Sequence, residues 1–147
     1  MVHKIQPLVR LAGMHGTLCH GCFDILHVGH IRQLAQARAL HAGPVIVTLT
    51  ADAFIRKGPG RPVFPDVIRA ECVAALETVD YVAIVEEATG LSAIDTIRPR
   101  YYVKGEEYEG MGGIAELERI AVESHGGMMV YTKRWCSSTS LVERLTA

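Results

Sequence analysis

Two histidines, His27 and His30, enclose Gly29 in a stretch that we expect to lead from a strand into a helix. Imidazole rings at such a place can donate hydrogen bonds to charge that builds on a phosphorus centre. The glycine lets an anionic ligand approach the backbone, and the free N–H groups of a helix start favour a phosphate. Paired histidines also occur as plain polar surface, but this spacing at this place favours phosphate binding.

A second cationic stretch lies in a loop rich in Gly and Pro that begins at Lys57. Exposed lysines are usually solvated charges, but a loop of this composition after a strand can close on a ligand. We therefore expect Lys57 to bind a phosphate group. Lys104, at the end of a later strand, can reach either a nucleotide or an acceptor molecule.

Short β-rich runs alternate with longer helical patterns, which is typical of a parallel sheet built from βαβ units. We expect strands at residues 17–23, 44–50, 81–85, 101–103 and 128–131, and helices at residues 30–41, 66–78, 92–97, 114–124 and 139–145. The predicted fold class is α/β, a doubly wound sheet of five parallel strands in a single domain, with residues 1–16 as an extension packed on it. Such a sheet binds its ligand beyond the carboxyl ends of the strands, near the topological switch point.

The composition is that of an ordinary globular protein: 147 residues, a formal net charge of −1, 49% hydrophobic and 21% charged residues. This length fits one domain, and this composition excludes a disordered chain. The near-zero charge argues against broad binding of nucleic acid, and no apolar run approaches the roughly 20 residues of a membrane span. The first ten residues lack the apolar segment of a signal peptide, so we expect a cytoplasmic protein with reduced cysteines.

Four motifs resemble, in the same order, those of the cytidylyltransferase-like nucleotidyltransferases. They are GCFD at residues 21–24 with HVGH at residues 27–30, KGPGRP at residues 57–62 with Arg69 after it, YVKGEEY at residues 102–108, and CSSTS at residues 136–140. The third motif is most similar to that of heptose 1-phosphate adenylyltransferases. Together the four motifs cover almost the whole chain from Thr17 onward.

The resemblance implies a Rossmann-like enzyme that transfers a nucleoside monophosphate from ATP or CTP to a sugar phosphate, releasing pyrophosphate and forming an NDP-sugar. It also implies Mg²⁺ as the cofactor, a nucleoside triphosphate and a phosphorylated small molecule as partners, and a homodimer. CTP with a polyol phosphate such as glycerol 3-phosphate is the second choice of substrates. The chain lacks the Walker pattern GxxxxGK[ST], which argues against a P-loop kinase.

The resemblance assigns roles to individual residues as well. His27, His30 and Lys57 are the expected catalytic residues, and His20 and Asp24 are expected on the acceptor side. Ten residues are expected to bind the nucleotide: Gly21, Cys22, Phe23, Gly29, Arg69, Lys104, Gly105, Ser137, Ser138 and Thr139. Of these, Gly21 and Phe23 are expected under the nucleotide and Gly105 near the base. The three hydroxyl residues are expected to contact the β- and γ-phosphates.

Two positions keep an open alternative. Asp24 can bind magnesium or fix the turn through its carboxylate, and we favour the turn. Near the last motif, Thr132 stands where the cytidylyltransferases have an arginine, and either Lys133 or Arg134 can take over its role.

Two functions of other classes compete with this interpretation. Cys19 and Cys22 with the two histidines are four residues of types that bind zinc, although cysteines three positions apart in a strand point to opposite faces. A nucleotide-binding regulator without catalysis is the other alternative, and the intact histidine pair with its cationic residues argues against it.

Overall fold

The computed structural model describes residues 2–133 and 138–147. Its single sheet has five strands: β1 (Thr17–Gly21), β2 (Val45–Thr50), β3 (Tyr81–Val85), β4 (Tyr101–Gly105) and β5 (Met128–Thr132). The strands are all parallel, in the order β3-β2-β1-β4-β5. The predicted α/β fold with a five-stranded parallel sheet is therefore confirmed.

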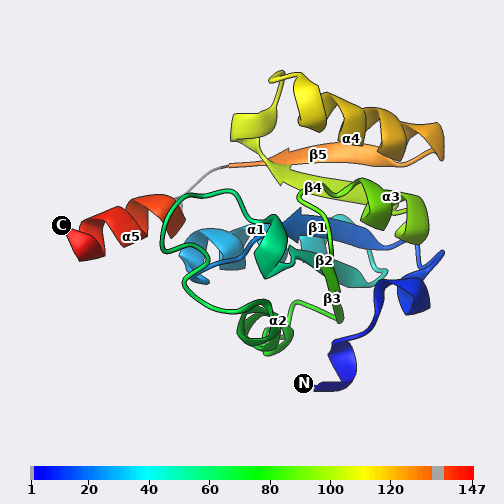
Figure 1. Cartoon of the computed structure of the whole chain (residues 1–147). Helices are drawn as coiled ribbons and strands as arrows, with labels where there is room; N and C mark the ends of the chain where they lie inside the picture. The colour runs from blue at the N-terminus through cyan, green and yellow to red at the C-terminus, as the bar shows by residue number, and fades with distance from the viewer. Residues whose placement is uncertain (1, 134–137) are drawn as a thin grey trace.

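Helices cover both faces of this sheet, and a further helix lies beyond it (Figure 1). The helices are α1 (Val28–Leu40), α2 (Asp66–Ala74), α3 (Leu91–Ile97), α4 (Gly113–Ser124) and α5 (Ser138–Thr146). Short 3-10 helices occur at Val2–Lys4, Leu8–Leu11, Asp52–Phe54 and Glu106–Tyr108.

Strand β2 explains why both faces are covered, because its side chains alternate between two apolar clusters. Val47 and Leu49 pack with residues of α1 and α2, such as Leu34 and Val73. Ile46 packs into the second cluster with residues of α3 and α4. All six residues of β2 are buried, as a strand between two helical layers requires.

The element boundaries differ from the expected ones where the backbone turns sharply. β1 ends at Gly21 instead of residue 23, because Phe23 and Ile25 have left-handed φ values of 50° and 62° that no strand accommodates. Helix α2 ends at Ala74 instead of residue 78, and its chain continues in tight turns such as the Leu76 N–H bond to the Val73 carbonyl.

The topological switch point lies between β1 and β4. From β1 the sheet continues through β2 and β3 on one side, and through β4 and β5 on the other. The strand arrows point to the side of the molecule where the long loop after β2 and helix α5 lie (Figure 1). The chain before β1 contacts the body of the domain through an Ile5–Val82 bridge and the buried Leu11. Within the described part of the chain, no helix is long and apolar enough to cross a membrane.

Candidate active site

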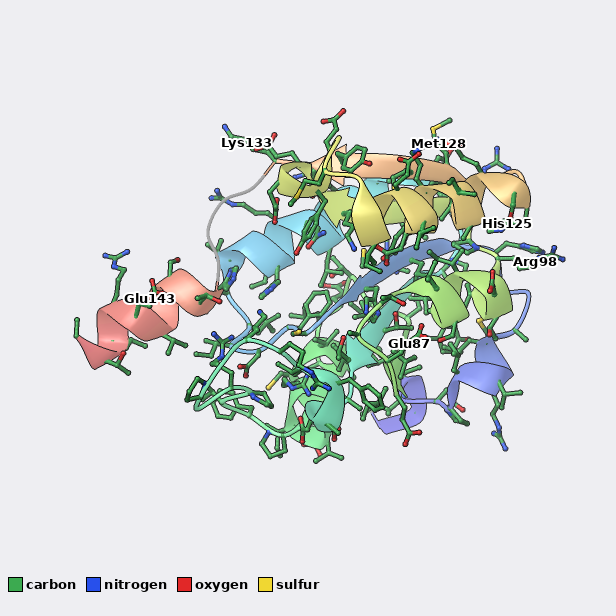
Figure 2. All side chains as sticks on the ribbon, turned by 45° about the horizontal axis from the view of Figure 1, so that its top comes forward. Glu87, Arg98, His125, Met128, Lys133 and Glu143 are labelled. Carbon is green, nitrogen blue, oxygen red and sulfur yellow. The ribbon has the colours of Figure 1, made fainter. Side chains whose placement is uncertain are left out.

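A cavity of about 730 Å³ opens at the carboxyl ends of the strands, within the size range of about 300–1,000 Å³ that small-molecule sites have. Eleven of the predicted site residues line it: His20, Gly21, Cys22, Phe23, His27, Gly29, His30, Lys57, Lys104, Gly105 and Thr139. Lys133 and Glu143, which also line it, lie on one side of the molecule, and Arg98 and His125 lie on the opposite side (Figure 2). Residues far apart in the sequence therefore meet at the expected edge of the sheet.

The two histidines form the start of helix α1. His27 is the N-cap residue, and its Nδ1 accepts a hydrogen bond from Gly29 N at 3.0 Å. His30 Nδ1 accepts one from His27 N at 3.3 Å, so that the two imidazoles together make a capping box. A neutral imidazole that accepts at Nδ1 carries its proton on Nε2. Both rings therefore carry the proton on Nε2, and both lie at a helix N-terminus, where negative charge is stabilised.

The two rings stack on each other, with centroids 3.9 Å apart and planes 25° apart, and Phe23 packs against His30 with centroids 4.9 Å apart. Burial, the neighbouring His27 and Lys57 together lower the pKa of His30 to about 3. Burial and Lys57 also lower the pKa of His27. The pair is therefore neutral at pH 7.

Lys57 is exposed in the loop that follows Ile55 and faces the cavity. Its charge is near enough to lower the pKa of both histidines. The same loop approaches α5, where Arg61 Nη1 donates to Thr139 Oγ1 at 3.3 Å. The second and fourth sequence motifs are therefore in direct contact.

Asp24 does not face the cavity, although it was assigned to the acceptor side. Its carboxylate is fully buried and accepts from Arg61 Nε at 2.8 Å, from Val63 N at 2.8 Å and from Phe64 N at 3.1 Å. Burial raises the pKa of this carboxyl, but the three hydrogen bonds outweigh it and the pKa is lowered. The acceptor assignment is corrected, and the turn-fixing alternative describes the contacts.

Arg69 also lies away from the cavity, in contrast to the assigned contact with the triphosphate. Its side chain is 1% exposed. The guanidinium donates to Asp52 Oδ1 and to three carbonyl groups, those of Cys22, Thr50 and Phe64, at 2.7–3.0 Å. Arg69 thus ties together the loops after β1 and β2, and four of its five N–H donors bond to protein acceptors.

Lys104 reaches the cavity from the end of β4 and forms an ion pair that the sequence did not suggest. Its Nζ lies 2.6 Å from Glu118 Oε1, and the Glu118 side chain is fully buried. The helix pattern does contain a signal for a buried carboxylate, because Glu118 lies between Ala115 and Val122 on the buried face of α4. A carboxylate on that stripe needs a partner inside the protein.

His20 faces the cavity from the end of β1 with both ring nitrogens in contact with protein atoms. Its Nδ1 lies 2.9 Å from Thr48 Oγ1, and its Nε2 lies 3.4 Å from the Ala88 carbonyl and 3.3 Å from Thr50 Oγ1. Burial and Lys104 lower the pKa of His20. Since a carbonyl only accepts, Nε2 carries the proton in this arrangement.

The last motif is described in part. Thr139 and Ser140 line the cavity near the beginning of α5, which starts at Ser138. Ser137 and Arg134 were singled out from the sequence, and both lie outside the described residues. Lys133 and Thr132 both line the cavity. Lys133 is exposed, whereas Thr132 is buried and donates from Oγ1 to the Lys104 carbonyl.

The four zinc-ligand residues do not converge on one point. Cys19 packs in the core between the sheet and α1, and burial raises the pKa of its thiol to about 12. Cys22, by contrast, lines the cavity. Among residues 2–133 and 138–147, no group of three or more His, Cys, Asp or Glu side chains is arranged to hold a metal ion.

Comparisons with known proteins agree with this geometry. The family model described as cytidylyltransferase-like matches residues 18–144. The bifunctional protein HldE of Syntrophotalea carbinolica is 39% identical over 98% of this chain and 29% of its own length. That of Nitrobacter winogradskyi is 40% identical over 92% of this chain and 28% of its own length. The chain thus spans less than a third of these relatives.

Two solved structures share the fold at low sequence identity. The lipopolysaccharide core biosynthesis protein of Thermoplasma volcanium has a TM-score of 0.65 and 24% identity, over 86% of this chain and 100% of that chain. The pantoate-beta-alanine ligase of Francisella tularensis has a TM-score of 0.64 and 12% identity, over 92% of this chain and 69% of that chain.

Proposed function

Because the chain belongs to the cytidylyltransferase-like family, we propose that it is an enzyme that transfers a nucleoside monophosphate to a sugar phosphate. The donor is ATP, or CTP in second place, and the products are pyrophosphate and an NDP-sugar. The third motif, with its similarity to heptose 1-phosphate adenylyltransferases, supports ATP and a sugar 1-phosphate. Relatives named bifunctional protein HldE, at 36–42% identity, support the same choice.

The observation that carries the proposal is the histidine pair. Both Nδ1 atoms accept from backbone N–H groups of the turn, so each neutral ring carries its proton on Nε2. In the reaction, an acceptor phosphate oxygen forms a bond to the α-phosphorus while the bond from that phosphorus to the pyrophosphate oxygen breaks. Two fixed donors stabilise the charge on the α-phosphate oxygens during this step.

The reaction needs no strong general base, because the attacking phosphate oxygen is already anionic at neutral pH. The work of the protein is to bring two polyanions together and to offset their charge. In our proposal Lys57 binds the triphosphate from its loop, and Thr139 and Ser140 contact it from the start of α5. All three line the same cavity as the histidines.

We propose that Mg²⁺ enters on the nucleoside triphosphate and not on a preformed protein site. Asp24 is already surrounded by three N–H donors, and the carboxylates that line the cavity are those of Glu107 and Glu143. Mg²⁺ is usually bound by substrate phosphates and water with only one or two carboxylates. The ion then lowers the negative charge of the triphosphate, which is the chemistry it supplies.

The acceptor is proposed to bind beside His20. This side chain lines the cavity and is held by Thr48 and by the carbonyl of Ala88. Because this imidazole is neutral and its nitrogens are engaged by the protein, it suits an uncharged part of the acceptor better than its phosphate.

The proposal is tested by measuring pyrophosphate release from ATP, CTP, GTP and UTP, each with a set of sugar 1-phosphates and with glycerol 3-phosphate. We expect release with ATP and a sugar 1-phosphate. Release with CTP and glycerol 3-phosphate alone would establish the second choice of substrates. Nucleotide binding without release for any pair would contradict catalysis and indicate a regulator. The variant His3→Ala, an exposed histidine near the amino ends of the strands, serves as the unaffected control.

We further propose that the chain forms a homodimer through α4 and the edge strand β5. Helix α4 exposes Ile114, Leu117 and Ile120 at three-residue intervals, and Met128 of β5 is 58% exposed. Several exposed apolar side chains on neighbouring elements are a reason to expect an interface. Sedimentation should give a dimer that Leu117→Glu dissociates, and a monomeric wild type would contradict the proposal.

We also propose a cytoplasmic location for the protein, because its proposed donor is a nucleoside triphosphate.

A further inference from the structure

The side chain of Glu118 connects three elements behind the wall of the cavity. Its Oε1 accepts from Lys104 Nζ of β4 at 2.6 Å. Its Oε2 accepts from Tyr102 Oη at 2.6 Å and from Gly90 N, the N-cap of α3, at 2.8 Å. The carboxylate is therefore held by three donors, and only one of them, Lys104, belongs to a residue that lines the cavity.

The fit around this carboxylate is close. A Cβ atom on Gly90 would lie 2.5 Å from Tyr102 Oη and 2.7 Å from Glu118 Oε2, so this position accepts no side chain without displacing the pair. Burying a charged carboxylate is costly, and an apolar residue of similar size often gives an equal or higher stability. Packing alone therefore does not explain why a glutamate occupies the apolar stripe of α4.

What the network does is to fix the position of an otherwise flexible cation. Lysine has four rotatable bonds, and its free ammonium group is mobile. Here Nζ is bound to Glu118 and lies 4.7 Å from the ring centroid of Tyr108, a cation–π contact with a second residue of the cavity wall. The Lys104 side chain is 13% exposed. Its remaining N–H donors are thereby fixed at the edge of the cavity.

We propose that Glu118 is a positioning residue that holds Lys104 Nζ in place for a hydrogen bond to a bound substrate. The inference rests on the function proposed above. Because Glu118 neutralises the charge of Lys104, the pair presents N–H donors without net charge. Such donors suit an uncharged oxygen or nitrogen of the substrate, in a base or a hydroxyl group, better than a phosphate.

The test compares Glu118→Gln with wild type in kcat and KM for each substrate. Glutamine keeps the shape and an oxygen for Tyr102 and Gly90, but its NH₂ group cannot accept from Lys104. We expect kcat/KM to fall about 10- to 100-fold, as misplacement of a positioning group does. Tm should fall as well, because Lys104 loses its buried partner, so kinetics are measured at a temperature where the variant is folded. Glu116→Gln, the same change on the exposed side of α4, is the matched control and should leave kcat/KM unchanged.

A double-mutant cycle separates positioning from a general structural effect. If Glu118 acts through Lys104, then Lys104→Met and the double variant Lys104→Met with Glu118→Gln have the same kcat/KM. Tyr102→Phe, which leaves the Lys104 pair intact, has a smaller effect than Glu118→Gln. Wild-type kcat/KM in Glu118→Gln, or an equal further loss in the Lys104→Met background, would overturn the inference.

The wild type is measured first, so that failure of the proposed function is distinguished from failure of this inference. If the wild type binds nucleotide without releasing pyrophosphate, the proposed catalysis fails, and the same cycle is carried out on the dissociation constant of ATP. An unchanged dissociation constant in both Lys104→Met and Glu118→Gln would then contradict the positioning role. A wild type that binds no nucleotide would contradict both proposals.

Discussion

The imidazole rings of His27 and His30 stack with centroids 3.9 Å apart, and the Nδ1 atom of each accepts a backbone N–H bond from the turn that carries them. The hydrogen bonds and the stacking fix the orientation of both rings before any substrate binds. Preorganised donors of this kind need no reorganisation when charge develops in the transition state. The same contacts cap helix α1, so the histidines serve the fold and the proposed chemistry together.

The tautomer of the two histidines can be observed directly. We expect nitrogen-15 NMR at about pH 7 to show a proton on Nε2 and none on Nδ1 for both rings, because both Nδ1 atoms accept from the backbone. The variants His27→Asn and His30→Asn assign the signals. A proton on either Nδ1, or a charged imidazolium, would contradict the capping geometry.

The stability of the protein should fall in mild acid because the partly buried His30 ring is neutral in the folded state. Its pKa is about 3 in the folded state and 6.5 without perturbation. Between these values the unfolded chain binds a proton that the folded chain does not, so stability is lost as the pH falls below about 6.5. Urea unfolding from about pH 7 to about pH 5 should show a loss of up to about 1.4 kcal/mol per pH unit from this residue. If the free energy of unfolding of wild type and of His30→Asn had the same slope against pH, His30 would not be the cause of the loss.

Variants of Arg69 and Lys57 should differ in what they lose: stability for Arg69 and activity for Lys57. Arg69→Met leaves three backbone carbonyls without their donor, and we expect the free energy of unfolding to fall by about 3 kcal/mol or more. Lys57→Met removes an exposed charge, so its unfolding free energy should change by less than about 0.5 kcal/mol. Its kcat/KM should nevertheless fall by about 100-fold. Full activity in Lys57→Met would remove this lysine from the mechanism.

The contact between Asp24 and Arg61 should couple two distant loops. Their side chains are 0% and 4% exposed, and the Nε–Oδ2 distance is 2.8 Å. In a cycle of Asp24→Ala, Arg61→Ala and the double variant, chemical denaturation should give an interaction energy of about 1–3 kcal/mol. Additive losses would show that the pair does not act as a unit.

Much of the fold follows from local pattern. The apolar run of β2 predicts a strand buried on both faces, and the spacing of apolar residues predicts α1 and α4. The histidine loop could be placed because a doubly wound sheet binds ligands at the carboxyl ends of its strands. Those predictions depend on short-range periodicity and on one topological rule.

The positions of some site residues depend on tertiary contacts that the sequence pattern does not reveal. The triphosphate role of Arg69 came from the family resemblance, and a fully buried arginine is rare. Only the convergence of the Cys22, Thr50 and Phe64 carbonyls explains its burial. Asp24 was misplaced for the same reason, since its donors lie 37 to 40 residues away.

The central claim is that the Nε2–H groups of His27 and His30 stabilise the transferred phosphoryl group. Its most direct test is the rate of pyrophosphate release at saturating ATP and sugar 1-phosphate for wild type, His27→Ala and His27→Asn. Asparagine preserves the N-cap whereas alanine costs about 1 kcal/mol of stability. We predict that both variants lose turnover about 10²- to 10³-fold, although only His27→Ala loses stability. Wild-type turnover in the folded His27→Asn variant would contradict the account.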